Sequence, residues 1–188
     1  MPRLPVLQVP QLSLPELNGE GFVLRGWRHT TPDIDAVLRA AHDPDISQYS
    51  TVGSATTPLR AAQWIASHTA PDRLDWAITR KGDVMGRVSL AHIDTTDGIA
   101  EVGYWLLPEN RGRGIASAAV GAVEYHAFGS LGVARLMICH EPPNVRSCLL
   151  AERRGYLAEG TLRSVFVRDG VRRDLHVHAR LATDPPVR

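Results

Sequence analysis

The segment Arg111-Gly112-Arg113-Gly114 carries the clearest chemical signal in the sequence. It stands between an apolar, strand-like run at 99–107 and a helical run that begins at Ile115 and continues through Ala116. The first N–H groups of a helix have no partner within it, and the helix dipole adds partial positive charge there. The two glycines let the backbone approach a ligand, and the two arginines add charge. The spacing therefore predicts an anion site that would accept a pyrophosphate.

Other interpretations of this turn require different residues. A dinucleotide-binding fingerprint needs a third glycine where Ser117 stands, and an acid at the end of the next strand, which is missing. A P-loop needs a lysine directly after its last glycine, and Ile115 occupies that position. A glycine-rich turn that merely joins a strand to a helix remains open on these residues alone.

The elements around the turn follow from the hydrophobic spacing. Runs of apolar residues, or of alternating apolar and polar residues, predict strands. Helices are predicted where a Thr-Pro pair or an Asn cap precedes apolar residues at helical spacing. Three consecutive strands form an antiparallel meander ahead of the turn, so the order argues for a mixed α/β sheet in one domain. The predicted strands are 22–24, 74–79, 84–93, 99–107, 134–140, 162–167 and 174–181, and the predicted helices begin near 31, 57, 115 and 144.

The bulk composition fits one globular domain. The chain has 188 residues, of which 44% are hydrophobic, and a formal net charge of +1, which gives no general attraction to nucleic acid or to an anionic membrane. We predict a proline-rich arm at 1–20, a single domain at 21–182 and a tail at 183–188. Prolines interrupt any apolar signal at the N-terminus, so the expected location is the cytoplasm.

The stretch 101–163 resembles the GNAT superfamily of N-acetyltransferases, and within it the ribosomal-protein N-terminal (RimJ/RimL-like) subgroup. Arg111-x-x-Gly114-x-Ala116 matches the coenzyme A pyrophosphate loop of that family, and Val102-Gly103-Tyr104-Trp105-Leu106 resembles its central strand. Asn144-x-x-Ser147 and Arg154-Gly155-Tyr156 follow the subgroup pattern in the same order. The resemblance covers about 20–181 and implies a sheet splayed between its two central strands, flanked by helices.

The resemblance implies acetyl-CoA as co-substrate. Its pantetheine arm would enter the gap between the two central strands and bond to exposed backbone near Leu106 and Leu107, with its pyrophosphate on the N–H groups of residues 112–116. Asn144 would cap the following helix and touch the pantetheine arm, or only cap the helix.

The implied reaction moves an acetyl group to a primary amine in a ternary complex. Glu101 is the first candidate base, because strand alternation places it with Gly103 and Trp105 on one face; a solvated glutamate is the alternative. Glu141 is the second, although we expect a plain surface charge there. The family often places a tyrosine after the second strand, but residues 145–154 contain none, so the resemblance puts Ser147 in its place; an ordinary first-turn serine is the alternative.

The acceptor cannot be chosen from these residues. Tyr49, Trp64 and Trp105 are the candidate acceptor contacts, although Trp105 fits the core better and Trp64 fits either the core or the acceptor pocket. An α-amine, with a pKa of about 7.7–8.0, needs less help from a base than a lysine at about 10.4. A protein N-terminus is the leading acceptor, and a small-molecule amine is the alternative. Two other classes of protein stay open: a non-catalytic acyl-CoA sensor and a nucleotide-binding regulator. The oligomeric state, monomer or homodimer, stays open.

The cysteine and histidine side chains bear on metal binding and on disulfides. His176 and His178 lie on one face of a predicted strand and could form half of a zinc site, but no third ligand stands close in sequence, so we predict no metal. Cys139 and Cys148 are expected to be reduced thiols in or near the core.

Overall fold

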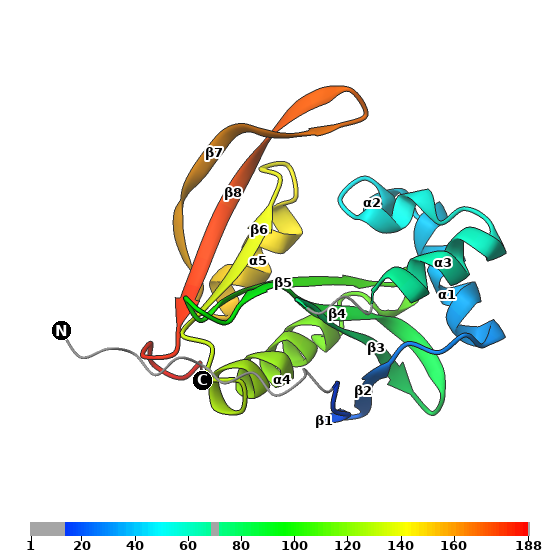
Figure 1. The fold of residues 1–188 in the computed structure, drawn as a ribbon, viewed down its shortest axis with the longest axis horizontal. Coiled ribbons are helices and arrows are strands. Elements are labelled where there is room, and N and C mark those ends of the chain that lie inside the picture. Colours follow the sequence, from blue (N-terminus) through cyan, green and yellow to red (C-terminus); the bar gives the residue numbers. More distant parts are fainter. Residues whose placement is uncertain (1–13, 69–71, 188) are drawn as a thin grey trace.

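The computed structural model describes residues 14–68 and 72–187, and its centre is one eight-stranded sheet in the order β1-β2-β3-β4-β5-β6-β8-β7 (Figure 1). The strands are β1 (Leu17–Gly19), β2 (Phe22–Gly26), β3 (Leu74–Arg80), β4 (Asp83–Asp94), β5 (Ile99–Leu106), β6 (Arg135–His140), β7 (Leu157–Arg168) and β8 (Val171–Leu181). The helices are α1 (Thr31–His42), α2 (Pro44–Ser47), α3 (Pro58–Ser67), α4 (Ile115–Gly129) and α5 (Val145–Arg153), with short 3-10 turns η1 (Thr51–Ser54) and η2 (Pro108–Asn110).

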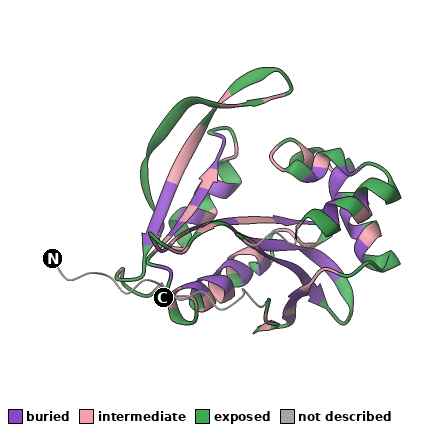
Figure 2. Cartoon of the chain, in the orientation of Figure 1, coloured by how far each residue is buried: buried purple, intermediate pink, exposed green. Residues whose placement is uncertain are grey.

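Helices cover both faces of the sheet, and each face has its own core. Residues of α4 and α5 pack with one face, where Val102 and Ile138 are buried. Residues of α1 and α3 pack with the other face, where Ala77 and Trp105 are buried. Figure 2 shows the buried residues running along the central strands, whereas the end of the β7–β8 hairpin is exposed.

The sheet divides between β5 and β6, as the resemblance implied. These strands are parallel and pair at only three positions, Ile99 with Arg135, Ala100 with Leu136 and Glu101 with Met137. Beyond Glu101 they separate, and β6 continues alongside β8 instead (Figure 1). The predicted α/β fold class is confirmed, and the division leaves one edge of β5 without a neighbouring strand.

The structure adds elements that the hydrophobic pattern did not indicate. Part of the predicted arm forms β1, which pairs with β2, and α2 and η1 lie between the helices predicted near 31 and 57, where the sequence indicated only a connecting loop. Their caps explain them: an Asp43 carboxylate oxygen accepts the Ile46 N–H at 2.9 Å, and the Ser50 hydroxyl accepts the Val52 N–H at 3.3 Å. Strands β7 and β8 extend beyond the predicted hairpin because irregular register lets the pairing continue past Gly160.

Candidate active site

The glycine-rich turn has the backbone conformation that an anion site needs. Gly114 is the N-cap of α4 with φ 74°, and Gly112 has φ 73°, both in the left-handed region that favours glycine. Among the residues that the structure describes, no side chain caps the first turn of α4. The N–H groups at the start of this 15-residue helix therefore remain available to a ligand.

The two arginines of the turn behave differently from each other. The Arg111 guanidinium lies 2.7 Å from an Asp43 carboxylate oxygen and 3.0 Å from one of Asp45, and its Nε donates to the Leu106 carbonyl at 3.0 Å. Its charge is therefore already paired, contrary to the expectation that it adds free positive charge to the turn. Arg113 is exposed.

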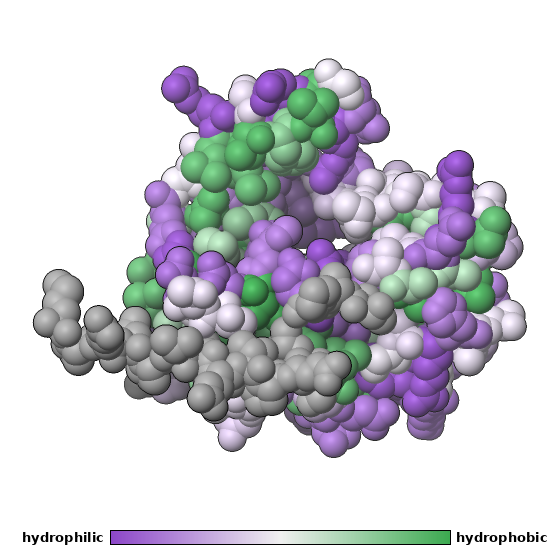
Figure 3. All heavy atoms as spheres, viewed as in Figure 1, coloured by the Kyte–Doolittle hydropathy of each residue, from purple (hydrophilic) through white to green (hydrophobic). Residues whose placement is uncertain are grey.

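The turn borders a large cleft of about 1090 Å³. Figure 3 shows the molecule hollowed between the β7–β8 side and the helical side. Most of the site residues predicted from sequence line this cleft: Tyr49, Glu101, Trp105, Leu106, Arg111, Gly112, Gly114, Ile115, Ala116, Asn144 and Ser147. The cleft thus joins the anion turn to the gap between β5 and β6.

At the free edge of β5, the backbone of Leu106 faces this cleft, whereas the backbone N–H of Leu107 does not. The Leu107 N–H donates to the Met85 carbonyl at 2.9 Å, and the Leu107 side chain is fully buried. Because backbone groups alternate in direction along a strand, those of Leu106 and Tyr104 point to the opposite edge, into the gap. Arg111 Nε already reaches the Leu106 carbonyl there. Of the two residues predicted to offer backbone groups to a ligand, Leu106 faces the gap and Leu107 does not.

Glu101 lies where the two central strands part. Its pairing with Met137 is the last between β5 and β6, and its side chain lines the cleft. Burial raises the pKa of the Glu101 carboxyl above its usual 4.5, and His92 and Arg73 oppose that rise. His92 sits in an irregular stretch of β4 with φ 51°. The position is not that of a freely solvated glutamate, and a raised pKa makes the carboxylate a stronger base.

Ser147 has a partner that the sequence did not reveal. Its hydroxyl lies 2.9 Å from the hydroxyl of Tyr104, which reaches it from β5 across the gap. Burial raises the pKa of Tyr104 to about 12. Asn144 caps α5 as predicted, because its side-chain oxygen accepts the Ser147 N–H at 3.3 Å. The missing helix tyrosine is thus matched by a tyrosine from the adjacent strand.

Glu141, expected to be a plain surface charge, is 8% exposed and paired. Its carboxylate accepts a hydrogen bond from Arg168 and lies 3.7 Å from Arg173, both on the closing hairpin. Arg168 also donates to the Gln48 carbonyl, so it connects the hairpin to the segment after α2. The expectation was wrong because these arginines are brought in by long-range pairing.

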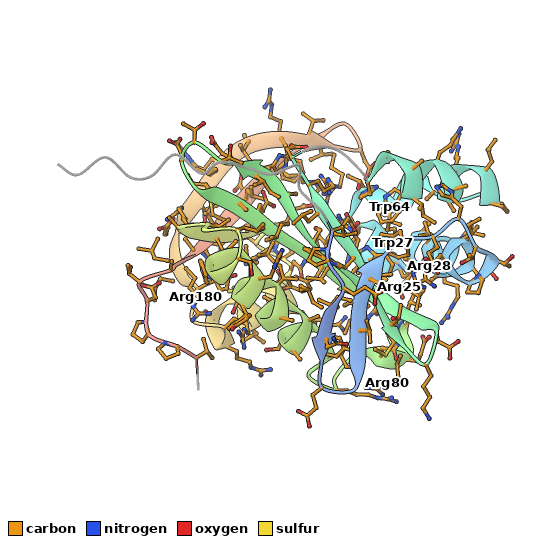
Figure 4. The ribbon with its side chains drawn as sticks, turned by 60° about the horizontal axis from the view of Figure 1, so that its bottom comes forward. Arg25, Trp27, Arg28, Trp64, Arg80 and Arg180 are labelled. Carbon is orange, nitrogen blue, oxygen red and sulfur yellow. The ribbon has the colours of Figure 1, made fainter. Side chains whose placement is uncertain are left out.

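The candidate acceptor contacts divide into two groups. Tyr49 is half-buried, Trp105 is 5% exposed, and both line the cleft. Trp64 instead belongs to the core beneath α3, 6% exposed, with its ring centroid 5.6 Å from that of Trp27. Figure 4 shows the two tryptophans close together at the helical end of the sheet. The acceptor role predicted for Trp64 has no support in its position.

Imidazole and thiol groups gather on the α5 side of β6 and β8. His140 and Cys148 join His176 and His178, although no third ligand was evident near that pair in sequence. Burial lowers the pKa values of His140 and His178, so both imidazoles are neutral near pH 7. Cys139 and Cys148 are unpaired thiols, as predicted. Burial raises the pKa of Cys139 to about 12.

Comparison with known proteins agrees with the fold. The family model of the acetyltransferase (GNAT) domain matches residues 22–156. The chain therefore belongs to the GNAT acetyltransferase family.

Two curated bacterial relatives are each 30% identical. One is the putative ribosomal N-acetyltransferase YdaF of Bacillus subtilis, matched over 118 residues, 63% of this chain and 64% of the relative. The other is the ribosomal-protein-serine acetyltransferase of Escherichia coli, matched over 104 residues, 55% of this chain and 58% of the relative. The chain thus spans less than two thirds of the length of either relative.

A solved structure of RimL, a ribosomal L7/L12 alpha-N-protein acetyltransferase in complex with coenzyme A, has the same fold with a TM-score of 0.79. The match covers 89% of this chain and 98% of that one at 19% identity. In the described part of the chain, no helix combines the length and apolar character needed to cross a bilayer.

Proposed function

We propose that the chain is an acetyl-CoA-dependent N-acetyltransferase that acts on a primary amine, with a protein N-terminus as the leading acceptor. The observation that carries the proposal is the uncapped start of α4 opening onto a cleft where β5 and β6 have separated. A helix N-terminus with left-handed glycines suits a diphosphate, and the free edge of β5 suits an extended, amide-containing arm.

The arrangement supports direct transfer between two bound substrates. The neutral form of the acceptor amine attacks the thioester carbonyl. Glu101 accepts the proton that the nitrogen loses as the amide forms, either directly or through a water molecule, and the carbon–sulfur bond breaks. Because burial raises the pKa of Glu101, its carboxylate is better matched to an amine than a solvated carboxylate would be.

Ser147 and Tyr104 stabilise the departing thiolate sulfur of coenzyme A. The Ser147 hydroxyl donates its proton, or a hydrogen bond, to the thiolate, and the Tyr104 hydroxyl 2.9 Å away orients it or replaces that proton. Tyr104, with a pKa of about 12, remains protonated at neutral pH and is available as a donor. The proton lost by the amine and the proton gained by the thiolate then balance.

A protein N-terminus is favoured among the acceptors by two considerations. An α-amine with a pKa of about 7.7–8.0 is partly neutral at pH 7, so a single carboxylate suffices as base. The two curated relatives are named as ribosomal acetyltransferases, one of them putative. A small-molecule amine remains the second candidate because the cleft is large, with a volume of about 1090 Å³.

The test is an acceptor screen that follows the release of free thiol from acetyl-CoA. Peptides with different N-termini are compared with the same peptides carrying a blocked α-amine and a free lysine, and with polyamines and aminoglycosides. We expect turnover with free α-amines that is lost in the blocked peptides. Turnover restricted to small amines would replace the leading acceptor, and binding of acetyl-CoA without any turnover would favour a sensor.

A further inference from the structure

Four potential metal ligands from three separate elements converge on the side of the sheet covered by α5. One ligand atom from each of His140, Cys148, His176 and His178 lies within 4.8 Å of the others. His140 is the last residue of β6, Cys148 is the fourth residue of α5, and the other two lie on β8. The register of β6 and β8 produces the cluster, because it pairs His140 with His176 and Ile138 with His178.

We propose that these four residues form a zinc site that fastens α5 to β6 and β8. This proposal does not depend on the acetyltransferase function. Imidazole nitrogen and thiolate sulfur are the ligands that zinc prefers, and four protein ligands are typical of a closed, structural site.

The geometry is close to what a tetrahedral ion requires. Zinc–nitrogen bonds of about 2.0–2.1 Å and a zinc–sulfur bond of about 2.3 Å place neighbouring ligand atoms roughly 3.3–3.6 Å apart. The Cys148 sulfur already lies 3.6 Å from His178 Nε2. The widest separation, 4.8 Å at most, needs to contract by no more than about 1.2–1.5 Å.

His140 provides a second, independent sign of a ligand. Its Nδ1 lies 2.8 Å from the Glu141 carbonyl, which fixes the proton on that nitrogen and leaves a lone pair on Nε2. The residue is 5% exposed, and its buried Nε2 has no hydrogen-bond partner within residues 14–68 and 72–187. Metal-binding histidines are commonly held in this way by a backbone carbonyl, and a cation would satisfy the otherwise unpaired nitrogen.

Binding changes the protonation of the cluster in one respect. The imidazoles bind through neutral nitrogen, whereas the Cys148 thiol loses its proton to solvent as the zinc–sulfur bond forms. The contact between the Cys148 sulfur and Glu152, 3.7 Å, is the one given up. No oxidant or other reactant is needed.

The test uses the full chain without a histidine tag. The protein is stripped with a chelator, dialysed against micromolar zinc and measured by elemental analysis, and a parallel sample is loaded with cobalt(II) to read thiolate-to-metal charge transfer. Cys148→Ser removes one ligand, and His176→Gln removes a half-buried ligand with little risk to folding. Cys139→Ser is the matched control, because alternation along β6 places Cys139 on the opposite face from His140.

We expect about one zinc per parent chain, a cobalt–thiolate band in the parent and in Cys139→Ser, and no such band in Cys148→Ser. His176→Gln should bind zinc at least tenfold more weakly, and chelation should lower the melting temperature of the parent but not that of Cys148→Ser. A parent that retains no zinc, or a band that survives in Cys148→Ser, would overturn the proposal.

Discussion

Replacing Gly114 with alanine tests the geometry of the anion turn without changing its charge. Gly114 has φ 74°, and an added Cβ would meet no heavy atom within 4 Å, so the substitution introduces backbone strain and no clash. An L-residue in the left-handed region costs about 1–2 kcal/mol. The residue is exposed, so the turn in the free protein is expected to relax away from this conformation.

The strain then weakens binding of the diphosphate. A turn that has relaxed must return to its original form before the N–H groups of α4 can face a ligand, and the cost is added to the free energy of binding. Since 1.4 kcal/mol corresponds to a factor of ten, about 1–2 kcal/mol lowers kcat/KM for acetyl-CoA roughly 5- to 30-fold. The assay measures thiol release with acetyl-CoA and with S-acetylpantetheine, which has the same thioester but lacks the diphosphate.

A second glycine in the same helix is the matched control. Gly129 ends α4, has no positive φ, and an added Cβ would meet nothing within 4 Å. Gly129→Ala should leave both kcat/KM values unchanged and raise the free energy of unfolding by about 0.5–1 kcal/mol. Equal losses with the two thioesters in Gly114→Ala, or no loss with acetyl-CoA, would refute the assignment of the diphosphate to this turn.

Three further substitutions address the proton transfers and the core. Glu101→Gln should lower kcat about 100-fold or more. The activity of the parent should fall as the pH decreases through a pKa above 4.5. Calorimetry should find the variant more thermostable than the parent above that pKa and equally stable below pH 4. Ser147→Ala should lower kcat at least tenfold with little change in acetyl-CoA affinity, by steady-state kinetics. Glu124→Gln should lower the urea-derived free energy of unfolding by about 3–5 kcal/mol, because Arg154 and Arg180 lose their buried partner.

The sign of the Glu101 prediction follows from linkage. A carboxyl whose pKa is raised by folding binds its proton more tightly in the native state, so its ionised form opposes folding at pH values above the unfolded pKa. Removing that charge therefore stabilises the protein at neutral pH, and the gain disappears once the carboxyl is protonated in both states. A variant that is both less active and more stable separates a catalytic carboxylate from a structural one.

Local patterns in the sequence predicted the parts of the site that depend on neighbours in the chain. The glycine spacing before Ile115 gave the turn its conformation, and the period of two along β5 correctly separated Trp105 from Tyr104 on opposite faces. The cap at Asn144 also formed as expected. These features need only local sterics and hydrogen bonding, which a short segment determines by itself.

Features that depend on contacts between distant parts of the chain could not be predicted from local sequence. The Arg111 partners lie 66 and 68 residues away in the chain, and the partner of Ser147 lies 43 residues away. His176 and His178 share a face by their spacing alone, but only the pairing of β6 with β8 brings His140 beside them. The sequence left Trp64 open between the cleft and the core, because a helical tryptophan can face either, and tertiary packing places it in the core.

The first turn of α5 connects the two proposals in this molecule. Successive helical residues point about 100° apart, so Ser147 meets Tyr104 of β5 while Cys148 meets His178 of β8. A zinc ion bound at Cys148 would hold the same turn that presents Ser147 to the gap between β5 and β6. The proposed donor hydroxyl would then be positioned by an ion bound at a neighbouring face of the same nine-residue helix, in addition to the core packing of Ala151.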